Sequence, residues 1–426
     1  MRKLTRRGLL ATSAAMTVPM VSTGLHAQVK PRVTVISQWS AGSDGAAITA
    51  LGKLFEQNGG EWEHNPVPGF TTDMMNKLRA QILSGDPPAA SQLKGPEIAA
   101  WSKIAPTNEL DKLVAEAGYE KVVVPELAKL HKPYGHWIAL PLQIYRINTL
   151  WASKKAMERV GATELPKTWA EFNALATKMK AAGIQPVMNA GVRWDNAMIW
   201  EIALNGISPA AYRKAVMELD EKTLTGPEVL AAFTQTRKFT DWMDPNVGNQ
   251  PYATYIPKFM AGDVGMLLMG GWTQGVFRSA GYQLTDYVVG PAPQDNGKPA
   301  FILNADAFIF WKRKEANLQA GQELMAKLIM SKEAQKMYSG ITGSVPVRTD
   351  MDLSDATFSN QQREASAALG TAMQGGQVTL SLAHNMAQPN QVTAAMLDVL
   401  TEFVHDRTIA PKDGQKRLAE AVDGVR

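Results

Sequence analysis

Strand-like and helix-like segments alternate along this chain, and the alternation limits the possible folds more than any other feature. Residues 32–38 are rich in β-branched side chains, which favour a strand. After a turn at 39–43, Asp44 stands where a helix N-cap is expected, and apolar residues at helical spacing follow between 48 and 55. A second helix is predicted over 72–84. Strand, loop and helix in this order predict the α/β class.

At 426 residues the chain exceeds the size of one typical hydrophobic core, so two domains are expected. A short strand is predicted over 89–93. Residues 134–147 are β-rich and lead to a predicted helix that starts at 151–155. Another strand, apolar at all but two positions, is predicted over 301–310, and the tail over 390–426 is predicted to be helical.

The positive charge of the chain is confined to its start. Lys and Arg outnumber Asp and Glu by 44 to 40, but four of the basic residues fall within residues 1–7 and no acidic residue precedes Asp44. Without residues 1–27 the balance is 40 − 40 = 0. A neutral chain lacks the basic footprint of a nucleic-acid-binding protein, so no nucleic-acid partner is expected.

Residues 1–27 have the three parts of a secretory leader: a basic start, a short apolar stretch over 9–21, and small residues before a cut after Ala27. The apolar stretch is too short and too polar to span a bilayer. We therefore expect a cleaved signal peptide and a soluble mature chain in the periplasm. Residues 5–10 (TRRGLL) resemble a twin-arginine motif, which leaves the general secretory route and the twin-arginine route both open.

The absence of cysteine excludes several kinds of site. It rules out a disulfide framework, a thiolate zinc site and a cysteine nucleophile. Among the histidines only His131 and His136 are close in sequence, and the proline and glycine between them disfavour a helical metal-binding pair. We therefore expect neither a metal nor a cofactor.

Four segments together carry a resemblance that none carries alone. They are 132–141 (KPYGHWIALP), 148–155 with 165–172 (NTLWASKK and LPKTWAEF), 259–272 (FMAGDVGMLLMGGW) and 343–348 (GSVPVR). In this order they resemble the extracellular solute-binding proteins of sugar ABC importers, over nearly all of the chain after the leader. The resemblance is strongest to glucose- and mannose-type periplasmic binders, which have counterparts of 92–95 (QLKG) and of Asn304 and Asp306.

This resemblance implies two α/β lobes of the periplasmic binding protein fold, joined by crossing hinge strands, with a ligand cleft that closes around the solute. It places residues 28–144 plus 304–344 in an N-terminal lobe and residues 145–303 plus 345–426 in a C-terminal lobe. We expect a monomer that delivers its solute to ABC permease subunits at the inner membrane.

A pyranose has apolar C–H faces and a rim of hydroxyl groups, so its site needs flat aromatic surfaces and paired polar groups. By resemblance, Trp39 and Trp272 are the stacking surfaces, although a core role is open for Trp39. Trp272 follows two glycines, which let the backbone approach a ligand closely. Relatives often have a second tryptophan where this chain has Gln38, so its sugar can differ from glucose.

The polar candidates each have two interpretations. Asp44 is a sugar ligand or a plain N-cap, and Lys94 is a donor to a sugar oxygen or a solvated surface lysine. Asn304 and Asp306 are two residues apart on a predicted strand, so their side chains share one face. That buried polar face needs partners, which sugar hydroxyls or an interlobe hydrogen-bond network would supply.

Three further positions complete the predicted site. Arg348 could donate hydrogen bonds to two sugar hydroxyls at once, or form an interlobe salt bridge. His384, within 381–385 (SLAHN), matches a histidine that contacts sugar in relatives, and is otherwise an ordinary surface or core histidine. Trp194 and Asp195 are an additional candidate pair.

Two other functions compete with sugar binding. An exported glycoside hydrolase needs two carboxylates across a cleft, and Asp44 and Asp306 could supply them. The sequence has no nucleophile-elbow, His-Glu-x-x-His or Walker motif, and its histidine spacing disfavours an exported metal-binding protein. We therefore predict a non-enzymatic sugar-binding subunit of an ABC importer. Its ligand is a monosaccharide such as glucose or a small oligosaccharide, and the sequence leaves the choice open.

Overall fold

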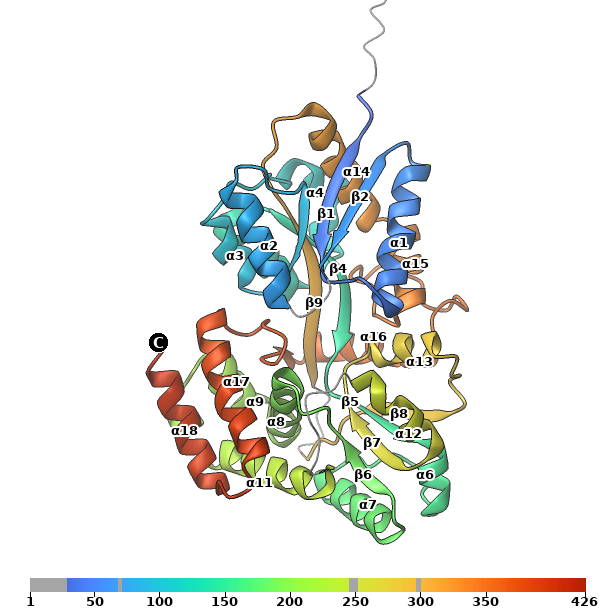
Figure 1. Cartoon of the computed structure of the whole chain (residues 1–426), viewed down its shortest axis with the longest axis vertical. Helices are drawn as coiled ribbons and strands as arrows, with labels where there is room; N and C mark the ends of the chain where they lie inside the picture. Colours follow the sequence, from blue (N-terminus) through green and yellow to red (C-terminus); the bar gives the residue numbers. More distant parts are fainter. Residues whose placement is uncertain (1–28, 68–70, 245–251, 296–299) are drawn as a thin grey trace, which may run out of the picture.

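Two β-sheets lie toward opposite ends of an elongated molecule (Figure 1). The computed structural model describes residues 29–67, 71–244, 252–295 and 300–426. The signal peptide predicted for residues 1–27 lies outside these ranges. We call the half built on the six-stranded sheet the first lobe, and the half built on the four-stranded sheet the second lobe.

The first-lobe sheet has the strand order β10-β9-β3-β1-β2, and β4 pairs with β9 outside this path. Its strands are β1 (Arg32–Ser37), β2 (Glu61–Pro66), β3 (Ala90–Leu93), β4 (Ala139–Arg146), β9 (Phe301–Phe310) and β10 (Val378–Leu380). β1 is parallel to β2 and β3, whereas β9 is antiparallel to β3 and β4. The carboxyl ends of β1 and β3 therefore point toward the second lobe, at the edge where open α/β sheets bind ligands (Figure 1).

Helices pack on both faces of the first-lobe sheet because the side chains of β1 alternate. Val33 and Val35 enter one hydrophobic cluster with α1 and α14, and Ile36 enters another with α2 and α3. The helices of this lobe are α1 (Gly42–Gln57), α2 (Thr71–Leu83), α3 (Glu97–Ser102), α4 (Asp111–Ala117), α5 (Pro125–His131), α14 (Ala316–Ile329), α15 (Lys332–Thr342) and α16 (Asn360–Gln374).

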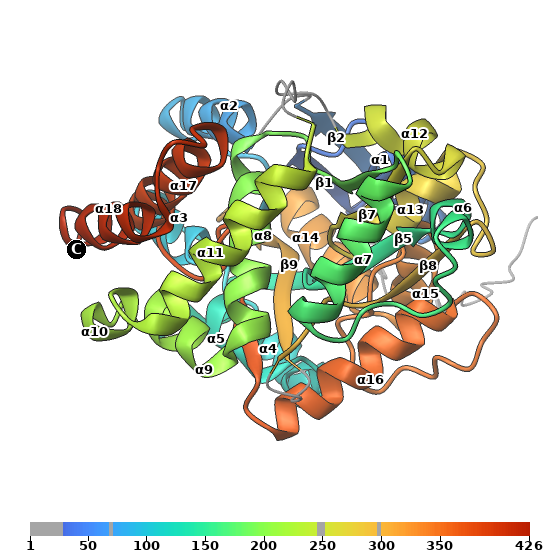
Figure 2. The ribbon, with the colours of Figure 1, turned by 90° about the horizontal axis from the view of Figure 1, so that it is seen from below.

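The second-lobe sheet has the order β6-β7-β5-β8. Its strands are β5 (Thr149–Ser153), β6 (Gln185–Met188), β7 (Val264–Leu268) and β8 (Tyr287–Pro291). Its helices are α6 (Lys154–Arg159), α7 (Trp169–Ala181), α8 (Arg193–Ile207), α9 (Pro209–Tyr212), α10 (Glu221–Leu224), α11 (Pro227–Trp242), α12 (Ile256–Ala261), α13 (Thr273–Ser279), α17 (Asn390–His405) and α18 (Pro411–Asp423). Figure 2 shows α17 and α18 together at the outer edge of this lobe.

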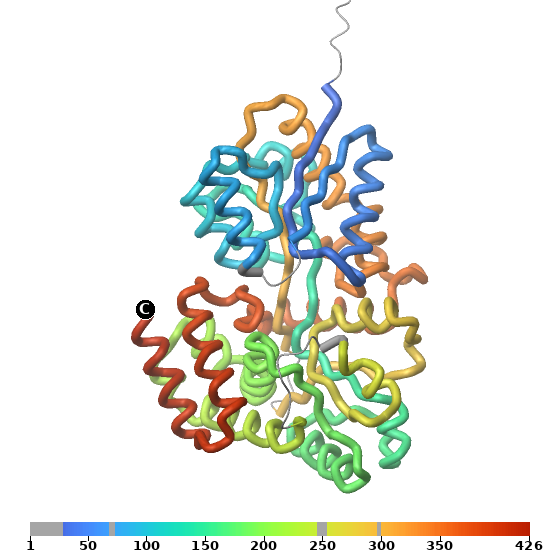
Figure 3. Tube along the Cα trace, in the orientation of Figure 1, coloured from blue at the N-terminus to red at the C-terminus, as the bar shows by residue number. Residues whose placement is uncertain are grey.

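Within the described residues the chain passes between the lobes at 146–149, at 300–303 and at 380–390 (Figure 3). The first two crossings lie side by side because β4 and β9 are paired from Ala139↔Ile309 to Arg146↔Leu303. Asn148 ties them together: its Nδ2 donates to the carbonyl of Ala300 at 2.8 Å, and its Oδ1 accepts from the Ile302 amide at 2.9 Å. These crossings fix the position of the polar residues on β4 and β9 between the lobes.

The packing refines the predicted division into lobes. Val345, Leu369 and Val378 belong to the same hydrophobic cluster as Val35 of β1, whereas residues from Leu382 onward mostly pack with α8 and α11 in the second-lobe cluster. By this criterion, residues 345–380 pack with the first lobe.

The elements predicted over 32–38, 72–84, 89–93 and 301–310 are found within one residue of their expected ends, whereas the β-rich stretch at 134–147 forms a shorter strand, β4. The strand predicted over 301–310 has the same bounds as β9. The helix predicted to start at 151–155 is wrong in its first part, because residues 149–153 form β5, a strand paired on both sides with β7 and β8. The predicted tail is two helices, α17 and α18. Over the described ranges, we find no helix with the length and apolar character needed to cross a membrane.

Candidate functional site

A buried carboxylate on β9 is the centre of a polar cluster at the lobe boundary. Asp306 is 4% exposed and lies opposite Gln143 of β4. Its Oδ1 accepts a hydrogen bond from Gln92 Nε2 at 3.0 Å, and its Oδ2 accepts one from Gln143 Nε2 at 3.1 Å. Lys94 Nζ, just beyond the end of β3, lies 3.5 Å from Oδ1. The charge of Asp306 is thus matched by one cation and two amide donors, as a buried charge requires.

Asp44 brings a second carboxylate to this cluster from the first turn of α1. The hydroxyl oxygen of Tyr145 lies 3.4 Å from Asp44 Oδ1. Burial, together with the negative charge of Asp306, raises the pKa of Asp44 to about 7. The N-cap interpretation of Asp44 is wrong, because the N-cap is Ala41 and no side chain caps this helix. The helix start instead directs the carboxyl group toward the crossing strands.

Gln143 and Tyr145 of β4 belong to the same cluster, although neither was among the predicted site residues. They lie opposite Asp306 and Asn304, so the four side chains share one face of the β4–β9 pair. Tyr145 Oη donates to Gln143 Oε1 at 2.9 Å. The alternation of two polar positions within an apolar strand was the available signal, since it repeats the pattern that identified Asn304 and Asp306.

The second lobe contributes an aromatic wall, which we define as Trp194, Trp272 and His384. The ring centroids of Trp272 and His384 are 5.1 Å apart, those of Trp194 and His384 are 5.7 Å apart, and those of Trp194 and Trp272 are 6.2 Å apart. Trp272 also contacts the ring of Tyr145 on the crossing strand. Gly270 makes room for it, because a Cβ there would lie 2.1 Å from the Trp272 ring. The wall therefore adjoins the polar cluster.

His384 is held in its neutral form within this wall. Its Nδ1 lies 2.8 Å from Ser381 Oγ. Burial and the positive charge of Lys94 together hold the pKa of His384 well below its ordinary value. The charge of Lys94, in the first lobe, thus lowers the pKa of His384, in the second lobe. The two side chains therefore face each other across the lobe boundary.

Several buried polar atoms around the cluster have no hydrogen-bond partner within the described ranges. They include Asn304 Oδ1 and Tyr338 Oη, and both residues are almost fully buried. An unpaired buried polar group costs about 1–3 kcal/mol, so each of these two atoms needs a partner or an explanation. Tyr338 is close enough to Asp44 and Asp306 for both negative charges to raise its pKa, after burial.

Trp39 lies behind the polar cluster in the hydrophobic cluster of the first lobe. It is 5% exposed, and its ring packs edge to face on Phe308 at 5.9 Å and against Tyr338 at 6.2 Å. The structure thus supports the core interpretation of Trp39, with Tyr338 connecting it to the two carboxylates.

The structure does not bring Arg348 or Asp195 into this group. Arg348 Nε and Nη2 donate to the two carboxylate oxygens of Asp350, at 2.8 and 2.7 Å. Its Nη1 donates to the carbonyl of Met330. Asp195 is buried, which raises its pKa to about 7, and its Oδ2 accepts from the Ala190 amide at 2.6 Å. The predicted residues that do gather at the boundary are Asp44, Lys94, Trp194, Trp272, Asn304, Asp306 and His384.

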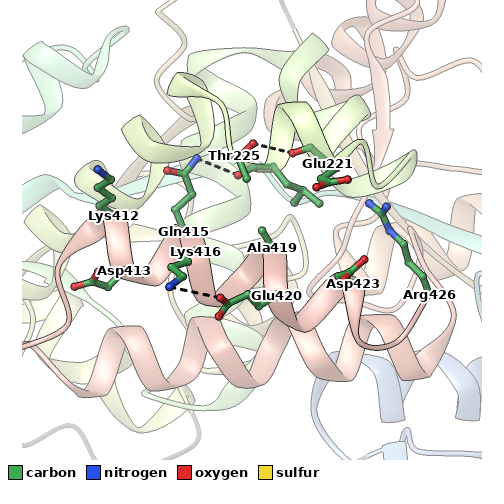
Figure 4. Close-up of a pocket in the computed structure, with 11 residues that line it drawn as sticks. Glu221, Thr225, Lys412, Asp413, Gln415, Lys416, Ala419, Glu420, Asp423 and Arg426 are labelled. Atoms are coloured by element: carbon green, nitrogen blue, oxygen red, sulfur yellow. Dashed lines mark hydrogen bonds and ion pairs between the residues drawn. The ribbon is translucent and has the colours of Figure 1, made fainter.

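Two other features lie apart from this site. A surface hollow in the second lobe is lined by α18 and the segment around α10, with lysine, aspartate and glutamate side chains interspersed (Figure 4). None of the predicted site residues lines it. In the first lobe, His136 Nδ1 lies 2.8 Å from Asp111 and 4.0 Å from Glu109, an exposed ion pair whose carboxylates raise the pKa of the histidine.

Comparison with known proteins relates this geometry to a family. The bacterial extracellular solute-binding protein family matches residues 50–403. A "probable sugar-binding periplasmic protein" of Brucella suis biovar 1 is 31% identical over 428 residues, and one of Rhizobium meliloti is 32% identical over 422 residues. The first alignment covers all of both chains, and the second covers 99% of this chain and all of its relative.

A solved structure supports the fold. The chain superposes on a chitin oligosaccharide binding protein with a TM-score of 0.76 and 19% identity, over 93% of this chain and 99% of that one. The predicted two-lobed α/β fold is therefore confirmed. The preference for a binding protein over an enzyme is confirmed as well, because the matched family consists of solute-binding proteins. The chain belongs to the bacterial extracellular solute-binding protein family.

Proposed function

We propose that this chain binds a neutral sugar between its lobes in the periplasm and delivers it to the permease of an ABC importer. The family assignment and the sugar-binding periplasmic proteins to which this chain is similar support this function. One observation carries it: the polar cluster of the first lobe adjoins the aromatic wall of the second, through the contact between Tyr145 and Trp272.

The chemistry of the two surfaces suits a pyranose. Carboxylate oxygens of Asp44 and Asp306 accept hydrogen bonds from hydroxyl groups, and the ammonium of Lys94 donates to them. The rings of the aromatic wall suit the apolar C–H faces of the sugar. Both kinds of contact require the lobes to lie together, which is how a hinged binding protein couples closure to its ligand.

The charges of the cluster favour an uncharged ligand. Lys94 and Asp306 balance each other at 3.5 Å, and the pKa of Asp44 is raised to about 7. An anionic or cationic solute would therefore find no unmatched counter-charge here, and its desolvation would be costly. We also propose that the chain acts as a monomer and has no nucleic-acid partner.

The proposed ligand-binding residues are Asp44, Lys94, Trp272, Asn304, Asp306 and His384, with Gln92, Gln143, Tyr145 and Trp194 beside them. Arg348 is omitted because its contacts lie elsewhere, and Trp39 supports the cluster from behind. The proposed lobes are 29–144 with 304–380, and 145–303 with 381–426, which moves residues 345–380 to the first lobe on the basis of their packing.

A calorimetric titration of the chain without residues 1–27 tests this function. Monosaccharides and disaccharides form the panel, and each neutral sugar is paired with an acid that keeps its pyranose ring, such as glucose with glucuronate. We expect one neutral sugar to bind in the micromolar range, about −8 kcal/mol, and its acid to bind far more weakly. Binding of the acids alone, or of no sugar at millimolar concentration, would refute the proposal.

A further inference from the structure

A buried glutamate of the second lobe is hydrogen-bonded to the segment that carries His384. Glu201 lies on α8 and is 0% exposed. Its Oε1 accepts from Ser381 Oγ at 2.7 Å, and its Oε2 accepts from the Leu382 amide at 2.7 Å and from Tyr212 Oη at 2.8 Å. Ser381 Oγ in turn lies 2.8 Å from His384 Nδ1. Carboxylate, hydroxyl and imidazole thus form an unbroken chain.

The hydrogen atoms in this chain can have only one arrangement when Glu201 is ionised. A carboxylate can only accept, so the single hydrogen of the Ser381 hydroxyl is directed to Oε1. Ser381 Oγ must then accept from His384, which requires the hydrogen of the neutral ring to be on Nδ1. The other ring nitrogen, Nε2, carries no hydrogen and can only accept.

We propose that Glu201, as a carboxylate, is a positioning residue which, through Ser381, fixes His384 in the Nδ1–H tautomer and so makes its Nε2 a hydrogen-bond acceptor for a ligand hydroxyl. The role of the ligand rests on the proposed function above. The tautomer does not, because it follows from contacts within the second lobe. His384 stays neutral at physiological pH, since burial and Lys94 hold its pKa well below the ordinary value.

Replacement of Glu201 by glutamine should reverse the arrangement. The Leu382 and Ala383 amides both point at Oε2, so the amide oxygen of glutamine is held at that position. Its NH₂ group then faces Ser381 and donates to the hydroxyl oxygen. The Ser381 hydrogen turns to His384 Nδ1, and the hydrogen of the ring moves to Nε2. An isosteric change would thus convert the acceptor into a donor.

The test is ¹⁵N NMR of the unliganded chain with labelled histidine, at pH 8 because burial raises the pKa of Glu201 to about 7. His384 is assigned from the signals that His384→Gln removes. We expect Nδ1–H in the wild type and Nε2–H in Glu201→Gln. Tyr212→Phe is the matched control: it removes another partner of Glu201 but leaves the Ser381 contact, so Nδ1–H should persist.

Two results would overturn the tautomer assignment: Nε2–H in the wild type, or the same tautomer in the wild type and Glu201→Gln. If Glu201→Gln does not fold, Ser381→Ala serves instead, and it should give a mixture of tautomers. Affinity for the sugar is measured separately and should fall roughly tenfold in Glu201→Gln, the loss of about one hydrogen bond. An inverted tautomer with unchanged affinity would refute the acceptor role of Nε2, because a sugar hydroxyl can also accept a hydrogen bond from an Nε2–H group. No sugar binding by the wild type would refute only the proposed function.

Discussion

The ring of Trp272 meets the ring of Tyr145 edge to face, with centroids 5.6 Å apart and planes at 86°. Trp272 precedes α13 in the second lobe, and Tyr145 lies on a strand that crosses from the first. The contact therefore joins the aromatic wall to Asp44, because the Tyr145 hydroxyl lies 3.4 Å from Asp44 Oδ1.

Trp272→Ala should weaken sugar binding by more than roughly tenfold, the loss expected when a buried aromatic anchor is removed. Calorimetric titration measures it. Trp242→Ala is the control, since this residue is also a partly exposed tryptophan of the second lobe but packs on Phe172 and Phe239 of its core. Equal affinities for the Trp272→Ala variant and the wild type would exclude Trp272 from the site.

Asp306→Asn should lower the free energy of unfolding by about 3–5 kcal/mol, because it leaves the charge of Lys94 buried without its partner. Urea denaturation of the variant measures this loss. The double variant Lys94→Met with Asp306→Asn should recover part of it, because both charges are then gone. If the losses of unfolding free energy in the two single variants simply added in the double variant, the energetic coupling between Lys94 and Asp306 would be contradicted.

The stability contributed by Asp44 should fall as the pH rises from about 4 to about 7. Its folded-state pKa, about 7, is above the ordinary value of 3.8, so the folded chain keeps a proton that the unfolded chain has released in this window. Each increase in pH within the window then favours unfolding. Urea denaturation at several pH values should show this slope in the wild type relative to Asp44→Asn, and parallel curves would contradict the raised pKa.

Gly95→Ala should weaken sugar binding by displacing the segment that carries His384. A Cβ on Gly95 would lie 2.2 Å from the carbonyl oxygen of Asn385 and 2.9 Å from Met386 Cα. Gly118→Ala is the control, since Gly118 also has a positive φ but open space around its Cβ position. Both variants should lose stability, of the order of 1 kcal/mol from backbone strain alone, but only Gly95→Ala should lose affinity. Equal sugar affinities of the Gly95→Ala and Gly118→Ala variants would contradict the predicted displacement of the segment that carries His384.

Local patterns were sufficient to predict much of the fold. The apolar run over 301–310 with its two polar interruptions predicted both the bounds of β9 and the shared face of Asn304 and Asp306. The start of β5 was misassigned because its central place between β7 and β8 depends on strands more than 100 residues away, which a local pattern does not contain.

The sequence predicted where residues of the proposed site lie on their strands and helices. It did not predict which side chains they contact in the fold. Gln143 shares the polar alternation that identified Asn304 and Asp306, but its contact with Asp306, 163 residues away, is not contained in that local pattern. Arg348 was included although its partner, Asp350, is two residues away, because no sequence pattern says which of several carboxylates a guanidinium will choose. Position on a strand can be read from sequence, whereas pairing across the lobes cannot.

The pairing of β3 with β9 has a consequence for the order in which the chain can fold. Gln92 and Asp306 are 214 residues apart, and the second lobe's sheet lies almost entirely between them in sequence. The pairing of β3 with β9 therefore cannot form until almost three quarters of the chain has been synthesised, and β10 joins the sheet later still. Such long-range closure slows folding, so a nascent chain of this protein should remain unfolded long enough to be handled by chaperones or an export machinery.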